Sequence, residues 1–394
     1  MNSYSVREVA AITGIGELKP TRDPGGKRAL ELMAEAARLA LLDAGLEKRD
    51  IDGILIAPPM EFLGMMMLPS YVGEYLGIRP SYANVVDLGG ASAAGMVARA
   101  AAAIAIGQCR NVLCLTGEAV SPELMTRLIG TFRWSPEEAS FEQPYGPMGV
   151  NSAYAMAAMR HIHEFGTRPE DLAKIAVEQR KNAQKNPEAI FHGKPITIED
   201  VLKSRLVVDP LHLLEIVMPV SGAAAVIVSD RSVAQRAGKA PAWILGAGEA
   251  YSHAVISQVG NITTTPVARS AEHAFRMSGV TRRQIDLVSV YDCYTIMVLL
   301  TLEDAGFCDK GQGGAFVAEH DLSYQGDFPV NTHGGQLSFG QAGLAGGTSH
   351  ITEAVRQIRG EAGERQLKNC DLVFVNGNGG VMSEEVSLVL GSGQ

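Results

Sequence analysis

A pair of glycines ahead of an alanine-rich segment is one place where this sequence could do chemistry. An apolar run ending in Asp87 turns at Gly89 and Gly90 and enters residues 91–106, which hold nine alanines and one charged residue, Arg99. Alanine has the highest helix propensity, and a helix with almost no polar face must be surrounded by other elements. The turn would present backbone N–H groups at the positive end of this helix, where an anion or an oxyanion can bind. A close-packed core helix with a tight turn is the alternative interpretation.

Two further stretches hold side chains that could reach a site. Residues 291–294 read Tyr-Asp-Cys-Tyr after a strand-like segment, and His333 stands in a loop next to glycine. The alternatives are aromatic packing at the end of a strand for the first stretch and a structural histidine for the second. Cys109 and Cys114 have no second pair that would complete a zinc site. The sequence therefore predicts no metal site.

Length and composition restrict the class of protein. The chain has 394 residues, 46% hydrophobic and 20% charged, as expected of a soluble globular protein larger than one ordinary domain. A net charge of −9 without a basic stripe argues against a nucleic-acid surface. The apolar runs are interrupted and alanine-rich, and the start lacks the basic and apolar regions of a secretory signal. With five scattered cysteines, we expect a cytoplasmic protein that binds neither nucleic acid nor a membrane.

One sequence pattern occurs twice in the chain. Residues 37–56 match residues 271–290 without a gap, at a constant offset of 234, and Gly45 pairs with Gly279. Each copy reads as an amphipathic helix, a glycine stop, a turn and a strand. We therefore expect an α/β fold of two similar packed halves, residues 1–235 and 236–394.

Most individual elements can be placed from hydrophobic periodicity and turn residues. The expected strands are 9–15, 54–57, 111–116, 223–228 and 371–375, and the expected helices are 28–44, 91–106, 152–165 and 346–359.

A long insertion interrupts the first half at about residues 118–221 and has no counterpart in the second. Insertions of this length usually cover a site or mediate assembly, so we expect a lid. Its aromatic and methionine side chains suit a bulky acyl group or dimer packing. They are Phe132, Trp134, Phe141, Tyr145 and Met148.

Several motifs together resemble those of the thiolase superfamily, and within it the sterol-carrier-protein-X type of thiolase. They are the helix after Gly90, YDCY at 291–294, LEDAGFCDKGQGG at 302–314, NTHGGQLSFGQAG at 331–343, EAVRQIRGEAG at 353–363 and NGNGG at 376–380. The resemblance implies a thiolase fold of five layers, αβαβα, built from two duplicated halves. It also implies homodimers and acyl-CoA thioester substrates, with no covalently bound cofactor.

The chain departs from the thiolase pattern at the residues that carry the chemistry. The resemblance places Gly90 where thiolases have a nucleophilic cysteine, and Ser92 lies about 200° further around the helix. The histidine of the family's G-H-P motif falls on Gln341, and the second cysteine of biosynthetic thiolases falls on Gly377. In the sterol-carrier-type H-D-C-F motif the cysteine is kept, as Cys293.

The missing nucleophile favours a reaction without an acyl-enzyme. Thiolytic cleavage of a β-ketoacyl-CoA needs a nucleophile, whereas retro-aldol cleavage of a β-hydroxyacyl-CoA needs a base and positioned hydrogen-bond donors. The chain resembles cysteine-lacking superfamily members that act on steroid side-chain CoA thioesters. We expect Tyr291, which replaces the histidine of H-D-C-F, to be the leading acid–base residue, assisted by Cys293 or Tyr294.

Further site residues are expected around this tyrosine. His333 is a second proton-transfer candidate, and Gln341 can donate a hydrogen bond but cannot exchange a proton. Backbone N–H groups of glycines are expected to bind the oxyanion and CoA, with a simple tight turn as the alternative for Gly379. These glycines are Gly90, Gly340, Gly379 and Gly380.

Two other functions stay open from the sequence. The chain could be a thiolase or Claisen-type acyltransferase that uses Cys293 as nucleophile, or a non-catalytic subunit that binds acyl-CoA. Relatives of this type resemble obligate partners of a small zinc-ribbon, OB-fold protein, so such a partner is possible here. Gln341 stands where steroid aldolases are expected to have tyrosine, which leaves the acyl group open.

Overall fold

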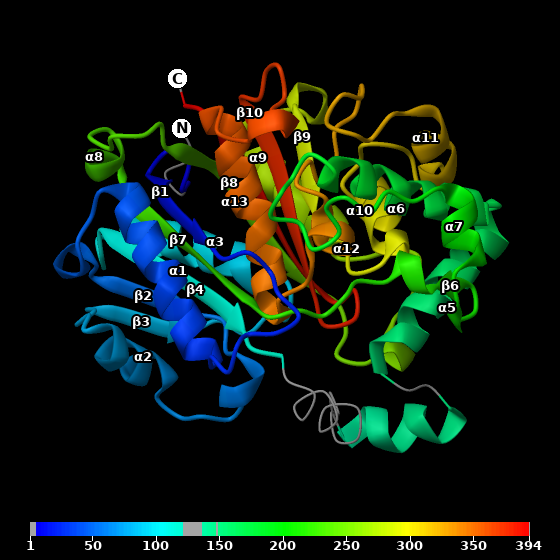
Figure 1. Ribbon diagram of the computed structural model, residues 1–394, viewed down its shortest axis with the longest axis horizontal. Helices are drawn as coiled ribbons and strands as arrows, with labels where there is room; N and C mark the ends of the chain where they lie inside the picture. The colour runs from blue at the N-terminus through cyan, green and yellow to red at the C-terminus, as the bar shows by residue number, and fades with distance from the viewer. Residues whose placement is uncertain (1–4, 121–135, 147–148, 394) are drawn as a thin grey trace.

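A single mixed sheet of nine strands runs through the computed structural model, which describes residues 5–120, 136–146 and 149–393 (Figure 1). The strand order is β3-β2-β4-β7-β1-β8-β11-β10-β9. Only two residue pairs join β1 to β8, so the sheet divides into five strands of the first half and four of the second. The strands are β1 (Ala10–Glu17), β2 (Gly53–Ile56), β3 (Tyr82–Val85), β4 (Asn111–Glu118), β7 (Gly222–Asp230), β8 (Ala242–Tyr251), β9 (Leu287–Val290), β10 (Leu372–Gly379) and β11 (Glu384–Gly391).

Two buried helices lie between the half-sheets. The alanine-rich α3 (Ser92–Ala105) and α13 (Gly346–Arg359) contact each other and strands of both halves. On the outer faces, α1 (Ala29–Ala44) covers β1, β4 and β7, and α9 (Val267–Ser278) covers β8 and β11 (Figure 1). Helices and strands therefore alternate through the molecule, which confirms the predicted αβαβα thiolase fold.

The internal repeat corresponds to matching structure in both halves. Helices α1 and α9 end at Gly45 and Gly279, which both adopt left-handed backbone conformations, with φ of 66° and 68°. A 3₁₀ turn follows each, beginning at Lys48 and Arg282, and then β2 and β9 begin at Gly53 and Leu287. The offset stays 234 at both points, from 48 to 282 and from 53 to 287. The duplication is thus visible in the fold, while the boundary at residue 235 stays a prediction.

The left-handed glycine at the end of α1 makes a testable contribution to stability. Replacing Gly45 by alanine is expected to lower the free energy of unfolding by about 1–2 kcal/mol, because an L side chain disfavours this conformation. Gly238→Ala is the matched control, since Gly238 does not have a left-handed φ and an added Cβ meets nothing within 4 Å. Equal urea midpoints for the two variants would contradict this role for Gly45.

The insertion packs against the second half of the molecule. Its helices α5 (Gly149–Phe165), α6 (Pro169–Ala183) and α7 (Ile198–Lys203) lie on the opposite side of Figure 1 from α2 (Leu68–Leu76). Helix α6 contacts three helices of the second half. They are α10 (Thr295–Asp304), α11 (Gly313–Glu319) and α12 (Gly335–Phe339). Other short elements are β5 (Leu206–Val208), β6 (Leu211–His212) and α8 (Arg231–Ala234).

The lid remains a prediction for the insertion. Phe132, Trp134 and Met148 lie outside the described residues. Phe141 and Tyr145 are exposed, a position compatible with either a substrate or a protein contact. Among the described residues, no helix has the length and apolar character needed to cross a membrane.

Strand β10 is longer than the sequence predicted. The expected strand stopped at residue 375, because the following NGNGG stretch is typical of a turn, but pairing with β11 continues to Gly379. Its glycines instead permit close packing, since a Cβ on Gly379 would stand 1.8 Å from the carbonyl oxygen of Leu88. The glycine-rich end of β10 is therefore pressed against the turn before α3.

Candidate active site

The ring of Tyr291 lies directly against Gly90. A Cβ built on Gly90 would stand 2.2 Å from Cζ of Tyr291 and 2.5 Å from the carbonyl oxygen of Asn378. Both distances are far shorter than van der Waals contact, so residue 90 has no room for a side chain while Tyr291 keeps its place. The tyrosine ring occupies the space into which a nucleophilic side chain at position 90 would project.

The ends of three strands bring these groups together. Tyr291 directly follows β9, which pairs in parallel with β10, and the Gly89–Gly90 turn lies between β3 and α3. A Cβ on Gly89 would be 2.9 Å from the backbone nitrogen of Gly380. Three of the four predicted oxyanion or CoA glycines, Gly90, Gly379 and Gly380, therefore meet in one place. Gly340, with φ of 118°, packs instead against Val220.

Tyr291 forms a hydrogen bond with Gln341. The Nε2 of Gln341 donates to the Tyr291 hydroxyl oxygen at 2.8 Å. Burial, with a contribution from Cys293, raises the pKa of Tyr291 far above its ordinary value. The tyrosine is therefore protonated at neutral pH and can donate its own proton. Gln341 is fixed in turn by backbone hydrogen bonds with Met218 and Val220.

Helix α5 of the insertion supplies two residues beside the YDCY segment. The ring of Tyr154 stacks on Tyr294 with centroids 4.1 Å apart, and the Tyr294 hydroxyl donates to Asn151. Asn378 Nδ2 donates to the Tyr154 hydroxyl at 2.7 Å and lies 3.6 Å from the sulfur of Cys293. Sequence reasoning missed Tyr154 and Asn151, because no motif marks this helix.

The environment of Cys293 keeps its thiol protonated. Burial raises the pKa of Cys293 to about 12, whereas the thiolate is the nucleophilic form. The Tyr294 hydroxyl behaves similarly, since burial raises its pKa well above the ordinary value. Both groups can donate hydrogen bonds, and neither is ionised near neutral pH.

His333 is buried next to a second histidine. Its Nε2 lies 3.2 Å from Ser349 Oγ, and its ring meets that of His350 edge to face, with centroids 5.0 Å apart. The ring of His350 lies 6.2 Å from that of Tyr291. Among the described residues, Nδ1 of His333 has no hydrogen-bond partner. Burial lowers the pKa of His333 well below its ordinary value, so the ring is neutral at pH 7.

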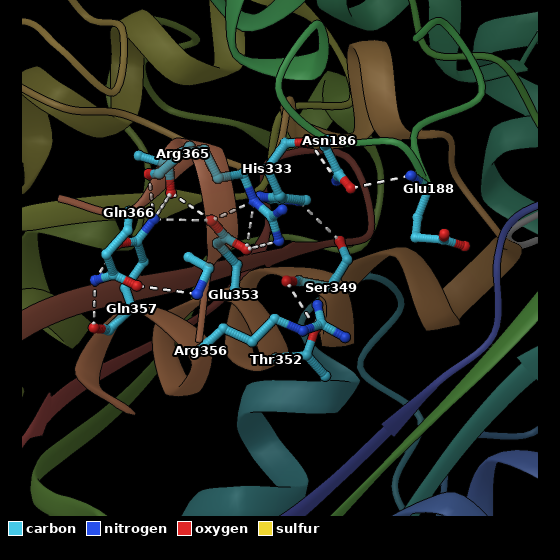
Figure 2. A network of polar contacts seen from close by, with 12 residues as sticks. Asn186, Glu188, His333, Ser349, Thr352, Glu353, Arg356, Gln357, Arg365 and Gln366 are labelled. Carbon is cyan, nitrogen blue, oxygen red and sulfur yellow. Dashed lines mark hydrogen bonds and ion pairs between the residues drawn. The ribbon is translucent and has the colours of Figure 1, made fainter. Parts of the chain in front are cut away.

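A buried polar network anchors the loop that carries His333. Figure 2 shows Glu353 joined to Arg365 and Gln357, with His333 and Ser349 nearby. Arg365 and Glu353 form an ion pair at 2.8 Å, and the Thr332 hydroxyl donates to Glu353 at 2.7 Å. Burial alone would raise the pKa of Glu353, but Arg365 outweighs it and lowers the value to about 2. The carboxylate therefore stays charged and holds the loop in place.

Two other buried polar residues, Ser92 and His161, have structural partners. The Ser92 hydroxyl donates to the Gly89 carbonyl at 2.6 Å and accepts from the Leu88 N–H at 2.9 Å, so it holds the turn. His161 bonds to Glu303, at 3.1 Å. Within the described part of the chain, no group of three or more His, Cys, Asp or Glu is placed to hold a metal ion.

A buried carboxyl group at the end of β4 connects the loops around the site. Glu118 accepts hydrogen bonds from the backbone N–H groups of Met60 and Ala119, at 3.0 and 3.2 Å. Its side chain also packs against Gly343, two residues after Gln341. Burial raises the pKa of Glu118 to about 7. The charged form of this residue is therefore disfavoured by the fold.

Glu118 is expected to make folding stability fall as pH rises. Because its pKa is about 7 when folded, against an ordinary 4.5, the folded chain binds this proton more tightly than the unfolded chain. Raising the pH from 4.5 to 7 therefore costs up to about 3 kcal/mol. Glu118→Gln lacks this titration. The free energy of unfolding of the variant minus that of wild type, measured with urea, should therefore rise from pH 5 to pH 8. The exposed Glu47→Gln is the control, and parallel curves for wild type and Glu118→Gln would refute the assignment.

Comparison with protein families matches both halves of the chain. The thiolase N-terminal domain family matches residues 10–213, and the thiolase C-terminal domain-like family matches residues 248–392. A solved structure called Ltp2-ChsH2(DUF35) aldolase superposes with a TM-score of 0.87 at 32% identity, over 98% of each chain. Human mitochondrial 3-ketoacyl-CoA thiolase, solved with CoA, shares the fold at a TM-score of 0.72 and 16% identity.

Three of the curated relatives that match most of the chain are enzymes named for acyl-CoA chemistry or side-chain cleavage. A steroid side-chain-cleaving aldolase of Thermomonospora curvata is 34% identical, over 89% of this chain and 90% of the relative. A 17-hydroxy-3-oxo-4-pregnene-20-carboxyl-CoA lyase of Mycobacterium tuberculosis is 32% identical, over 89% and 92%. An acetyl-CoA acetyltransferase of Methanothermobacter thermautotrophicus is also 32% identical, over 89% and 91%. The chain, with its glycine turn at 89–90 and both domains matched, belongs to the thiolase family.

Proposed function

We propose that this chain cleaves the Cα–Cβ bond of a β-hydroxyacyl-CoA by a retro-aldol reaction that forms no acyl-enzyme. The observation that carries the proposal is the contact of the Tyr291 ring with Gly90, which leaves no space for a nucleophile at that position. The relatives named as an aldolase and a CoA lyase support the same reaction class.

The reaction conserves protons and consumes no free CoA. The substrate hydroxyl loses its proton and becomes a carbonyl as the Cα–Cβ bond breaks. The electron pair of that bond moves into the thioester and forms an enolate, which hydrogen-bond donors stabilise. Cα takes up a proton as the substrate hydroxyl gives its proton up, so the negative charge on the enolate is transient. The products are a ketone or aldehyde and a shorter acyl-CoA.

Tyr291 is the residue we assign to proton transfer. Because its hydroxyl is protonated in the free enzyme, it can give a proton to Cα while it takes up the proton of the substrate hydroxyl. Gln341 orients the hydroxyl through their hydrogen bond. Cys293 and Tyr294 assist as hydrogen-bond donors, and neutral His333 is a reserve proton acceptor.

We assign enolate and CoA binding to the glycine cluster. The N–H groups at the Gly89–Gly90 turn lie at the positive end of α3, and Gly379 and Gly380 pack against this turn. We also assign CoA binding to Gly340, which lies apart from this cluster and directly precedes Gln341. The substrate is not covalently attached, and no covalently bound cofactor takes part.

A thiolytic reaction through Cys293 is the second candidate function, favoured by the acetyl-CoA acetyltransferase relative. It would require a thiolate at Cys293, whose pKa of about 12 opposes ionisation. Thiolysis consumes free CoA, whereas retro-aldol cleavage does not. The requirement for CoA therefore separates the two functions.

We further propose a homodimer, a protein partner and a cytoplasmic location. Strand β3 is an edge of the sheet, and its Val85 is exposed, so a second copy could pair there. The related structure called Ltp2-ChsH2(DUF35) aldolase carries two protein names. This supports a protein partner, which we propose to be a small zinc-ribbon, OB-fold protein. Light scattering of the chain alone tests the dimer.

The experiment compares β-hydroxyacyl-CoA and β-ketoacyl-CoA substrates. The panel contains 17-hydroxy-3-oxo-4-pregnene-20-carboxyl-CoA, 3-hydroxyhexanoyl-CoA and 3-oxohexanoyl-CoA, each with and without free CoA and a zinc-ribbon partner. We expect a shorter acyl-CoA and an equimolar carbonyl product from a hydroxy substrate without free CoA. Cleavage of only the oxo substrate, dependent on CoA, would support the thiolase function. No turnover even with the partner would support a non-catalytic subunit.

A further inference from the structure

Asp292 binds the start of the short helix that precedes Gln341. It follows Tyr291 directly and is fully buried. Its Oδ1 accepts the backbone N–H of Gln336 at 2.8 Å, and its Oδ2 accepts that of Leu337 at 3.0 Å. These N–H groups belong to the first turn of α12, where a helix supplies no acceptors of its own. The carboxylate therefore supplies two of the missing acceptors.

The other end of α12 leads back to Tyr291. The helix is five residues long, ends at Phe339 and is followed by Gly340. The next residue, Gln341, donates to the Tyr291 hydroxyl at 2.8 Å. Tyr291, Asp292, α12 and Gln341 therefore form a closed ring of covalent and hydrogen bonds. A shift of α12 at its first turn would move the amide of Gln341 relative to the tyrosine.

The surroundings leave Asp292 and Gln341 little freedom. A Cβ on Gly335 would stand 2.2 Å from Asp292 Oδ2, and a Cβ on Gly346 would stand 3.1 Å from Gln341 Cγ. His350 Nε2 lies 3.2 Å from Asp292 Oδ1 and can donate a hydrogen bond when it carries a proton. Close packing of this kind restricts both side chains to one arrangement.

We propose that Asp292 is a positioning residue, which fixes the amide of Gln341 against the Tyr291 hydroxyl by holding the first turn of α12. The catalytic part of this inference rests on the proposed function, whereas the structural part does not. In Asp292→Asn the NH₂ group would face a backbone N–H, so one hydrogen bond to α12 is replaced by two opposed donors. Gln341 should then lose its fixed place although its own side chain is unchanged.

A double-mutant cycle with Gln341→Ala tests the proposal. For a β-hydroxyacyl-CoA of the panel, each single variant is expected to lower kcat about 10- to 100-fold with a smaller change in KM. The double variant should be no more than about threefold slower than the slower single variant, because both changes remove the same interaction. Losses that multiply would show that Asp292 does not act through Gln341 and would overturn the proposal.

Glu303→Gln is the matched control for removing a buried carboxylate. Glu303 is buried and accepts the N–H of Gly313 at 2.8 Å at the start of α11, so it caps a different helix. We expect this variant to lose stability and to keep kcat within about threefold, with no coupling to Gln341→Ala. If Glu303→Gln were coupled to Gln341→Ala as strongly as Asp292→Asn is, the loss of kcat in Asp292→Asn would come from general destabilisation. That result would refute a specific role of Asp292.

Amide hydrogen exchange tests the structural part without any turnover. Asp292→Asn should speed exchange at residues 336–341 at least tenfold, while exchange in α11 stays as in wild type. Glu303→Gln should instead speed exchange in α11 and leave exchange at residues 336–341 as in wild type. Unchanged exchange at residues 336–341 would overturn the proposal. Inactivity of wild type towards the whole panel would instead refute the proposed function and leave this result valid.

Discussion

Replacing Tyr291 by phenylalanine is expected to lower kcat for retro-aldol cleavage by about 100- to 10,000-fold, the usual contribution of a positioned acid or base. The variant keeps the ring that packs against Gly90 and loses only the hydroxyl bonded to Gln341. KM and the affinity for an acyl-CoA substrate should therefore change little. Rapid-quench assays measure kcat and KM, and calorimetric titration measures the affinity for the acyl-CoA substrate.

The control for this variant is a tyrosine elsewhere in the molecule. Tyr71 lies on α2, where its ring meets Phe62 edge to face, and Tyr71→Phe should keep wild-type kcat. If Tyr291→Phe turned over at the wild-type rate, the proposed proton transfer by Tyr291 would be wrong. If it lost acyl-CoA binding as well, the hydroxyl would have a binding role instead.

Gly90→Ala is expected to have a large effect on both folding and turnover. The added methyl group would stand 2.2 Å from the Tyr291 ring and 2.5 Å from the Asn378 carbonyl oxygen, so the ring or the strand must move. Overpacking of a buried site costs about 1–3 kcal/mol. We expect that loss of stability in urea unfolding, with kcat lowered at least 100-fold because the hydroxyl of Tyr291 is displaced.

A second substitution, at Tyr291, separates the clash with the tyrosine ring from other effects of Gly90→Ala. Tyr291→Ala removes the ring, so Gly90→Ala should destabilise the Tyr291→Ala variant by less than it destabilises wild type. Turnover should stay lost in the double variant, since the hydroxyl is absent. Equal destabilisation in both backgrounds would show that the ring does not fill the space at residue 90.

Much of the fold was predictable because it follows from local patterns. The repeat at offset 234 contains a helix, a glycine stop and a strand, each encoded in neighbouring residues, and the structure repeats them at the same offset. The alanine-rich composition of α3 also predicted its burial between layers. The family motifs then predicted how these layers are arranged.

The candidate site was less predictable, because it depends on contacts between distant residues. Tyr154 reaches Asn378 from an insertion without a motif, and Asp292 acts on Gln336, 44 residues away. The expected strand ended at residue 375, yet β10 continues to Gly379, and its glycines allow it to pack closely against the turn that contains Gly90. The contact of Tyr291 with Gly90 unites two motifs that are 201 residues apart, from 90 to 291, and only the three-dimensional arrangement reveals it.

The most direct test of the account is the intact mass of the protein during turnover of a β-hydroxyacyl-CoA, measured by acid quenching and denaturing mass spectrometry. We expect unmodified protein at every time point, while the shorter acyl-CoA and the carbonyl product accumulate together. A protein species heavier by the mass of an acyl group, located on Cys293 or any other residue and formed as fast as product, would contradict it.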